Sequence, residues 1–300
     1  MKKKTYLFAL MAMVLTLGSC SDNENGIGGE TSKYITVSTS IGNMTRVATD
    51  ANGGQTFEEG DEISVYAWTG DATVAPETRE RVVNNAINKL TNGSWVSTPQ
   101  MLWKNNRDKH YFIGVYPTAA ISDFTAGEYK LDVAKQEDSD LLVAVNASGI
   151  SYNADEQQTV PLTFTHVMAK LAVNLTYKNQ WGGIPTVEKV VVGNAAKEAT
   201  INYLTKVVTP STTAKEDFSL PEITENTKYV SVIIPQEEVT QLTIVIGGKN
   251  FVYDNGTPFK LESGKITTVN LEVGRDEIKL GDVKITNWED GSTFSGEALN

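Results

Sequence analysis

The feature that most constrains the fold is a series of short segments rich in Val, Ile, Thr and Tyr, separated by Gly, Asn and Asp. Such segments form β-strands, because β-branched and aromatic side chains pack well on a pleated surface. Strands that recur at short intervals with turn residues between them are typical of antiparallel β-sandwiches. The clearest segments are residues 34–41, 62–68, 110–116, 140–145, 160–164, 170–177, 188–192, 229–234, 241–246 and 265–273.

Helical periodicity is weak throughout the sequence. The best helix candidate, residues 77–90, fits a strand and a turn equally well. Residues 170–177 alternate cleanly, because Leu171, Val173 and Leu175 fall on one face of an extended chain. This segment is therefore predicted to be a strand with one buried and one solvated face.

One turn can be placed from its residues. Residues 251–253 and 257–261 flank Asp254-Asn255-Gly256. An Asn-Gly pair supplies the positive φ angles that a tight β-turn requires. A hairpin is therefore predicted with its turn at residues 254–256.

The N-terminal residues have the three parts of an export signal. Three lysines at residues 2–4 precede an apolar run over residues 6–17, which is too short to span a bilayer as a helix. Leu17-Gly18-Ser19-Cys20 then resembles a bacterial lipobox, whose cysteine is acylated before cleavage. Cys20 is the only cysteine, so no disulfide can form within the chain. We expect cleavage before Cys20 and a lipid anchor on it; the alternative is an ordinary secretory signal with a chance cysteine.

The residues after Cys20 carry a second signal. Ser21, Asp22, Asn23 and Glu24 resemble the acidic tetrapeptide that accompanies surface export of lipoproteins in Bacteroidetes-type bacteria. The alternative is a plain solvated tether, since residues 25–31 form a Gly-rich linker. The expected location is the cell surface, with the lipid on Cys20 held in the outer membrane.

The rest of the chain is long enough for two domains. Removal of residues 1–19 leaves 281 residues, and each half supplies about seven predicted strands. We therefore predict an all-β chain of two tandem antiparallel β-sandwich domains. The predicted divisions are a signal peptide (1–19), a tether (20–32), an N-terminal sandwich (33–164), a C-terminal sandwich (165–276) and a C-terminal strand with a tail (277–300).

Charge argues against one class of partner. The formal net charge is −11, and it becomes −14 when the three lysines of the signal are lost. An acidic chain without a basic block cannot neutralise phosphates, so nucleic-acid binding is not expected.

The sequence offers no recognisable catalytic or metal site. It lacks a G-x-S-x-G elbow, an H-E-x-x-H helix and a phosphate loop, so neither an enzyme nor a cofactor is predicted. His110 and His166 lie in different predicted strands without metal-ligand spacing, and His166 is predicted to be a structural histidine. Residues 137–140 lack the calcium-loop pattern and are predicted to form a solvated loop. The five tryptophans are predicted to fill the core.

Several blocks, taken in order along the chain, resemble the fimbrillin-like family, the pilin subunits of Bacteroidales-type pili. The most specific is FTHVMAKL at residues 164–171, similar to the family's F-x-H-x-x-A-K-L signature. In the block around Tyr111 to Pro117, Gly114 stands where the family usually has alanine. The other blocks are FEEGDEISVY (57–66), Trp103, DLLVA (140–144), IIPQ (233–236), LESGK (261–265) and Asn287-Trp288 with Gly291.

The resemblance implies two transthyretin-like sandwiches and assembly by strand exchange. In that process a protease removes the N-terminal strand of a lipidated precursor, and a neighbour's C-terminal segment fills the groove. Residues 34–41 suit the first role, because their alternate residues Ile35, Val37, Thr39 and Ile41 form an apolar face, as in a strand at a sandwich edge.

Arg46 is the predicted cleavage site, because cleavage there would remove the lipid and the N-terminal strand together. The alternatives are an ordinary exposed arginine, cleavage at Lys33 or a protease of other specificity. Ile278, Leu280, Val283 and Ile285 alternate with polar residues and form the predicted donor strand, with a break at Gly281-Asp282.

The predicted function is a structural subunit of a cell-surface pilus that contributes to adhesion. Its expected partners are other pilin subunits and a host or bacterial surface ligand; a shaft, anchor or tip position stays open. The alternative is a lipid-anchored surface binding protein, for a glycan or a host molecule, that does not polymerise. A shaft subunit and the binder differ in the mature protein, because the shaft subunit would begin near Val47 without lipid, whereas the binder would keep an acylated Cys20.

Overall fold

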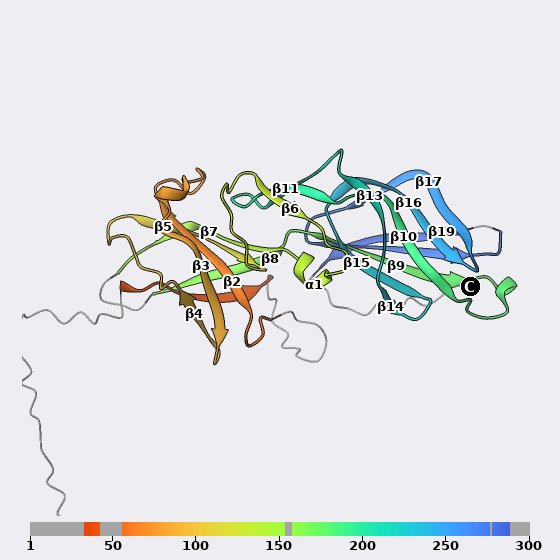
Figure 1. The fold of residues 1–300 in the computed structure, drawn as a ribbon, viewed down its shortest axis with the longest axis horizontal. Coiled ribbons are helices and arrows are strands. Elements are labelled where there is room, and N and C mark those ends of the chain that lie inside the picture. The colour runs from red at the N-terminus through yellow and green to blue at the C-terminus, as the bar shows by residue number, and fades with distance from the viewer. Residues whose placement is uncertain (1–32, 43–55, 154–157, 277, 289–300) are drawn as a thin grey trace, which may run out of the picture.

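The structure is a computed structural model that describes residues 33–42, 56–153, 158–276 and 278–288. The described residues form four β-sheets, one short α-helix and short 3-10 turns (Figure 1). The all-β prediction is therefore confirmed. No helix in these ranges is long and apolar enough to cross a membrane.

The first sheet has seven strands in the order β1-β8-β7-β5-β2-β3-β4 and occupies one half of the elongated molecule (Figure 1). Its strands are β1 (Thr36–Ile41), β2 (Glu62–Thr69), β3 (Val83–Thr91), β4 (Ser94–Thr98), β5 (Lys109–Tyr116), β7 (Leu142–Ser151) and β8 (Thr159–His166). The helix candidate at residues 77–90 is instead a 3-10 turn, η2 (Thr78–Glu80), followed by β3.

The other three sheets lie in the second half. The five-stranded sheet, in the order β14-β15-β9-β18-β19, contains β9 (Ala169–Tyr177), β14 (Glu222–Thr224), β15 (Lys228–Ile233), β18 (Lys265–Val273) and β19 (Ile278–Asn287). The four-stranded sheet, β13-β10-β16-β17, contains β10 (Val187–Ala196), β13 (Lys215–Ser219), β16 (Gln236–Ile246) and β17 (Lys249–Leu261). The three-stranded sheet, β12-β11-β6, contains β6 (Gly127–Lys130), β11 (Glu198–Asn202) and β12 (Val207–Pro210). The helical elements here are α1 (Gln136–Ser139) and η3 (Asn179–Trp181).

The core has two parts, and β2 contributes to both. Val65 belongs to a cluster enclosed by the first sheet, whereas the neighbouring Tyr66 and Trp68 join a larger cluster that continues into the second half. This division follows from the alternation of side chains along a strand. Strand β6 also links the two halves, because it precedes β7 and β8 of the first sheet in sequence but pairs with β11 of the second half. The boundary at residues 164/165 therefore stays a prediction about folding units.

Pairing departs from a purely antiparallel arrangement in two places. Strand β1 pairs parallel with β8, and β9 pairs parallel with β18. The buried face predicted for β9 is confirmed, since Leu171, Val173 and Leu175 are buried. The opposite face is fully exposed only at Thr176, and Ala172 on that face is buried as well.

The hairpin predicted at residues 254–256 is wrong. Strand β17 continues through this segment, and the turn that joins it to β16 lies at Gly247 and Gly248. Both glycines have positive φ, 58° and 71°, which is the conformation such a turn requires. The Asn-Gly pair instead lies within an irregularity of the β16–β17 ladder.

Candidate functional site

The N-terminal strand β1 lies at the edge of the first sheet and closes part of its core. Its register with β8 runs from Thr36 opposite Thr159 to Ile41 opposite Phe164. Ile35 and Val37 are 2% and 6% exposed, so the apolar face predicted for residues 34–41 points into the core at these positions.

The other edge of β1, together with the residues just before it, makes only a few contacts. The backbone N–H of Ile35 donates to the carbonyl oxygen of Met101 at 3.0 Å, and Trp103 N–H donates to Lys33 at 3.2 Å. Farther along, Trp95 Nε1 donates to Thr39 Oγ1 at 3.0 Å. Among the described residues, β1 and β4 are the two outer strands of this sheet and form no continuous ladder with each other.

A groove follows this open edge. A hollow of about 840 Å³ lies between β1 and β4, lined by residues that include Val37, Thr39 and Trp95. It shares Ile41 and Phe57 with a second hollow of about 560 Å³, which reaches residues of β15. The Phe57 ring, which lines both hollows, makes edge-to-face contacts with the rings of Trp95, Tyr116 and Phe164.

The close packing beneath β1 explains Gly114. A Cβ atom at this position of β5 would lie 2.6 Å from Cζ of Phe164 and 3.2 Å from Cδ1 of Leu162. Glycine therefore fits a chain in which large β8 side chains approach β5 closely.

The predicted donor residues lie on β19, at the edge of the five-stranded sheet. They face buried residues of β18, with Ile278 opposite Val273 and Val283 opposite Val269. Because β19 is the outermost strand, Val283 and Ile285 are still 38% and 40% exposed. No described strand pairs with its outer edge.

The break predicted at Gly281-Asp282 is a bulge within one continuous strand. The register shifts where Leu280 pairs with Leu271 and Val283 with Val269. The Asn270 amide fills this place by donating to Asp282 Oδ1 at 2.8 Å. The bulge keeps the four predicted donor residues on the inner face of the sheet.

Three of the sequence motifs, those that contain Asp140, His166 and Trp288, meet near the end of β19. His166 and Lys170, both from FTHVMAKL, contact the ring of Trp288. Asp140 accepts a hydrogen bond from His166 Nδ1 at 2.8 Å, so His166 is packed and hydrogen-bonded as predicted. The solvated loop predicted at residues 137–140 is corrected, because α1 forms there and Asp140 turns toward His166. The sequence did not predict that these residues touch. The only indication was that each belongs to one of the motifs.

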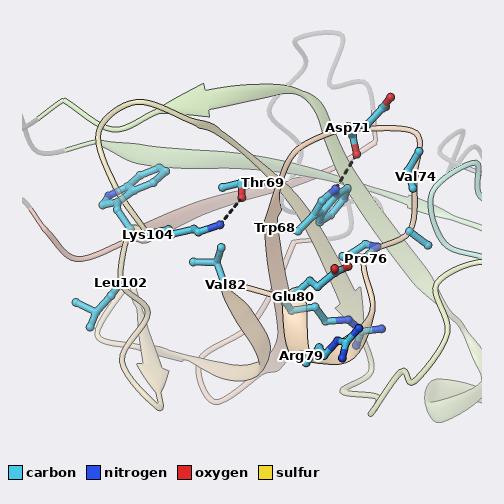
Figure 2. A pocket seen from close by; sticks show the side chains of 13 residues that line it. Trp68, Thr69, Asp71, Val74, Pro76, Arg79, Glu80, Val82, Leu102 and Lys104 are labelled. Carbon is cyan, nitrogen blue, oxygen red and sulfur yellow. Dashed lines mark hydrogen bonds between the residues drawn. The ribbon is translucent and has the colours of Figure 1, made fainter.

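A further hollow, of about 720 Å³, opens on the first sheet (Figure 2). Its lining includes the exposed residues Val74 and Leu102, and Lys104 donates to Thr69 Oγ1 at 3.1 Å. The tryptophans in the lining, Trp68 and Trp103, are buried. Neither ring presents an open face on which a sugar could stack, so the hollow gives no specific support to the glycan-binding alternative.

The remaining predicted site residues are Cys20, Ser21, Asp22, Asn23, Glu24 and Arg46, which lie outside the described residues. Within the described ranges, no three His, Cys, Asp or Glu side chains gather as metal ligands would.

Comparison with known proteins places this geometry in context. A family model described as fimbrillin-like matches residues 45–288. A candidate fimbrium subunit of Bacteroides uniformis, Fim1C, is 24% identical over 315 aligned positions, which cover 97% of both chains. A crystal structure of a candidate cell adhesion protein from Bacteroides uniformis has a TM-score of 0.62 at 20% identity, covering 78% of this chain and 93% of that one. Another from Bacteroides ovatus has a TM-score of 0.62 at 17% identity, covering 85% and 98%. The two structures share the fold.

Proposed function

Because the chain belongs to the fimbrillin-like family, we propose that it is a structural subunit of a cell-surface fimbria that contributes to adhesion. The family consists of fimbrial and adhesion proteins, not of enzymes. Other fimbrial subunits would be its partners. The observation that carries the proposal is that an edge strand stands near each end of the described chain, β1 and β19.

Strand β1 supports the role of a removable strand. Its departure would uncover the edge of β8 and the apolar residues beneath Ile35 and Val37. Unpaired backbone groups and exposed apolar surface are both unfavourable in water, and both are complementary to an incoming strand. The hollow beside β1 would widen into a groove that runs toward β15.

Strand β19 supports the role of a donor. It pairs with β18 along one edge only, and its apolar residues alternate with polar ones on either side of the Gly281 bulge. An acceptor groove with pockets for alternate side chains could bind this strand by β-augmentation. We propose that β19 leaves its own sheet and occupies the β1 position of a neighbouring subunit.

Export and processing complete the proposal. The lipid on Cys20 and the Ser21–Glu24 signal would deliver the precursor to the outer surface. Cleavage after Arg46 would then release the lipid and β1 together, because both precede this residue. The lipid would serve delivery in a shaft subunit and would stay only in an anchor subunit.

Arg46→Ala tests the processing step in cells that assemble the fimbria. The variant should accumulate as a full-length lipidated precursor and form no polymer, as judged by electrophoresis and electron microscopy of surface extracts. Arg79→Ala is the matched control, because Arg79 is an exposed arginine on η2, remote in sequence from β1. Normal polymers from Arg46→Ala would overturn cleavage at this residue. Absence of polymer from the wild-type chain would overturn the fimbrial function itself.

A further inference from the structure

The residue that follows β19 is far more buried than the strand's own apolar side chains. Trp288 is 5% exposed. Its ring stacks on His166 with a centroid separation of 4.2 Å and an angle of 6° between the planes. Lys170 Nζ lies 4.3 Å from the centroid of the same ring, and Trp288 N–H donates to the Gly264 carbonyl at 3.1 Å. Stacking, cation–π attraction and a backbone hydrogen bond therefore act on one residue.

The residues that surround Trp288 are themselves held by hydrogen bonds. We call His166, Lys170 and Gly264 the Trp288 slot. Asp140 fixes the His166 ring, and Gly264 N–H donates to Met168 at 2.8 Å. Gly264 has φ +67°, and a Cβ there would lie 3.0 Å from the His166 carbonyl oxygen, so only glycine suits this approach.

The slot also carries features that oppose permanent burial. Trp288 Nε1 is buried without a hydrogen-bond partner among the described residues. An indole N–H removed from water without an acceptor is unfavourable. Burial lowers the pKa of Lys170, although the nearby Asp140 carboxylate acts in the opposite direction. The ring contacts therefore favour the bound position of Trp288, whereas the desolvation of its indole N–H and of the Lys170 ammonium group opposes it.

The Trp288 slot lies next to the end of β1. Gly42 N–H donates to the Phe164 carbonyl at 2.8 Å, and Ile41 is opposite Phe164 in the β1–β8 register. His166 follows only two residues later on β8. The end of the proposed removable strand and the end of the proposed donor strand thus contact one short segment of β8.

We propose that Trp288 is a latch that keeps β19 on its own subunit and must leave the Trp288 slot before the strand is donated. The biological meaning of the latch rests on the proposed strand exchange. The contacts of Trp288 that hold β19 in place do not depend on strand exchange, because they form within a single molecule.

The latch is tested by hydrogen exchange of the purified monomeric chain, read by mass spectrometry over β19. Trp288→Ala should raise exchange of the β19 amides about 100-fold, because a large buried side chain is lost from the end of an edge strand. Trp288→Phe keeps a smaller ring and should raise it about tenfold, which keeps the test valid if the alanine variant does not fold. Trp95→Ala is the matched control, because it removes a tryptophan beside β1 and should change β19 exchange less than about twofold. Unchanged β19 exchange in a folded Trp288 variant would overturn the latch.

Polymer assembly separates this proposal from the previous one. If the β19 amides exchange faster in the Trp288 variants but wild-type subunits never polymerise, the latch stands and the fimbrial function fails. If wild-type subunits polymerise and the Trp288 variants exchange like the wild type, the latch alone fails.

Discussion

Strands β1 and β19 are both edge strands, but their side chains are held in different ways. Val37 of β1 and Ile35 just before it are buried in the core of the first sheet, and the Ile35 N–H also donates to Met101 on the far side. The inward residues of β19 are partly exposed, and the most buried contact of its segment is made by Trp288 beyond the strand. The comparison indicates that the β1 segment contributes buried side chains to a core, whereas β19 covers the margin of its sheet with side chains that stay partly exposed.

The largest expected effect comes from a charge on the buried face of β1. Val37→Asp should lower the free energy of unfolding by about 3 kcal/mol or more, because an unpaired carboxylate would enter the core. Ser38→Asp is the control, since Ser38 is exposed on the opposite face of the same strand. Urea titration of both variants measures the difference. Equal, small losses would show that β1 does not close the core.

The second effect compares Gly114, in the core that β1 covers, with Gly281 on β19 itself. Gly114→Ala should lower the free energy of unfolding by about 1–3 kcal/mol, because the new Cβ would overlap the Phe164 ring. At Gly281 on β19 a Cβ would lie 3.2 Å from the Asn270 carbonyl, which a sheet margin accommodates more readily. Gly281→Ala should therefore cost less than about 1 kcal/mol. A larger loss at Gly281 would reverse the comparison.

A third effect concerns the support of Trp288. Asp140→Asn should lower the free energy of unfolding by about 1 kcal/mol, because His166 would lose its charged acceptor while the side-chain shape is kept. Thermal unfolding gives the change in stability, and hydrogen exchange should place the loosening in β19. Asp108→Asn is a suitable control in the same measurements, because the Asp108 side chain belongs to an exposed turn. Loosening confined to other strands would contradict the role assigned to Asp140.

The smallest effect is expected on the outer part of β19. Ile285→Ala should lower the free energy of unfolding by less than about 1 kcal/mol, because this side chain is already 40% exposed. The same substitution at Ile35, the residue just before β1, should lower it by about 2–5 kcal/mol, because Ile35 is buried. Chemical denaturation of the pair gives the ratio directly, and similar values would remove the distinction between the strands.

Sequence patterns predicted the features that depend on side-chain alternation. The buried faces of residues 34–41 and 170–177 followed from a period of two, because strands expose and bury alternate residues. Short-range contacts are of the same local kind, such as the 2.7 Å hydrogen bond that the Glu58 N–H donates to the Asp61 carboxylate. The residues adjacent in sequence are therefore enough to predict which face of a strand is buried and where a local turn forms.

Pairing between distant strands was not available from the same patterns. Thr36 and Thr159 are far apart in sequence, and alternation indicates a strand's buried face but not its partner. The Asn-Gly signal at residues 255–256 was outweighed by Gly247-Gly248, which permits a tighter connection between β16 and β17. The contact of His166 with Trp288 was hidden for the same reason, because it joins motifs from two remote segments.

The most direct test of strand exchange is the N-terminus of subunits taken from assembled fimbriae. Mass analysis of these subunits should find a chain that begins at Val47, without lipid and without β1. A polymer whose subunits begin at an acylated Cys20 and retain residues 33–42 would contradict the account, because the groove would still hold its own strand.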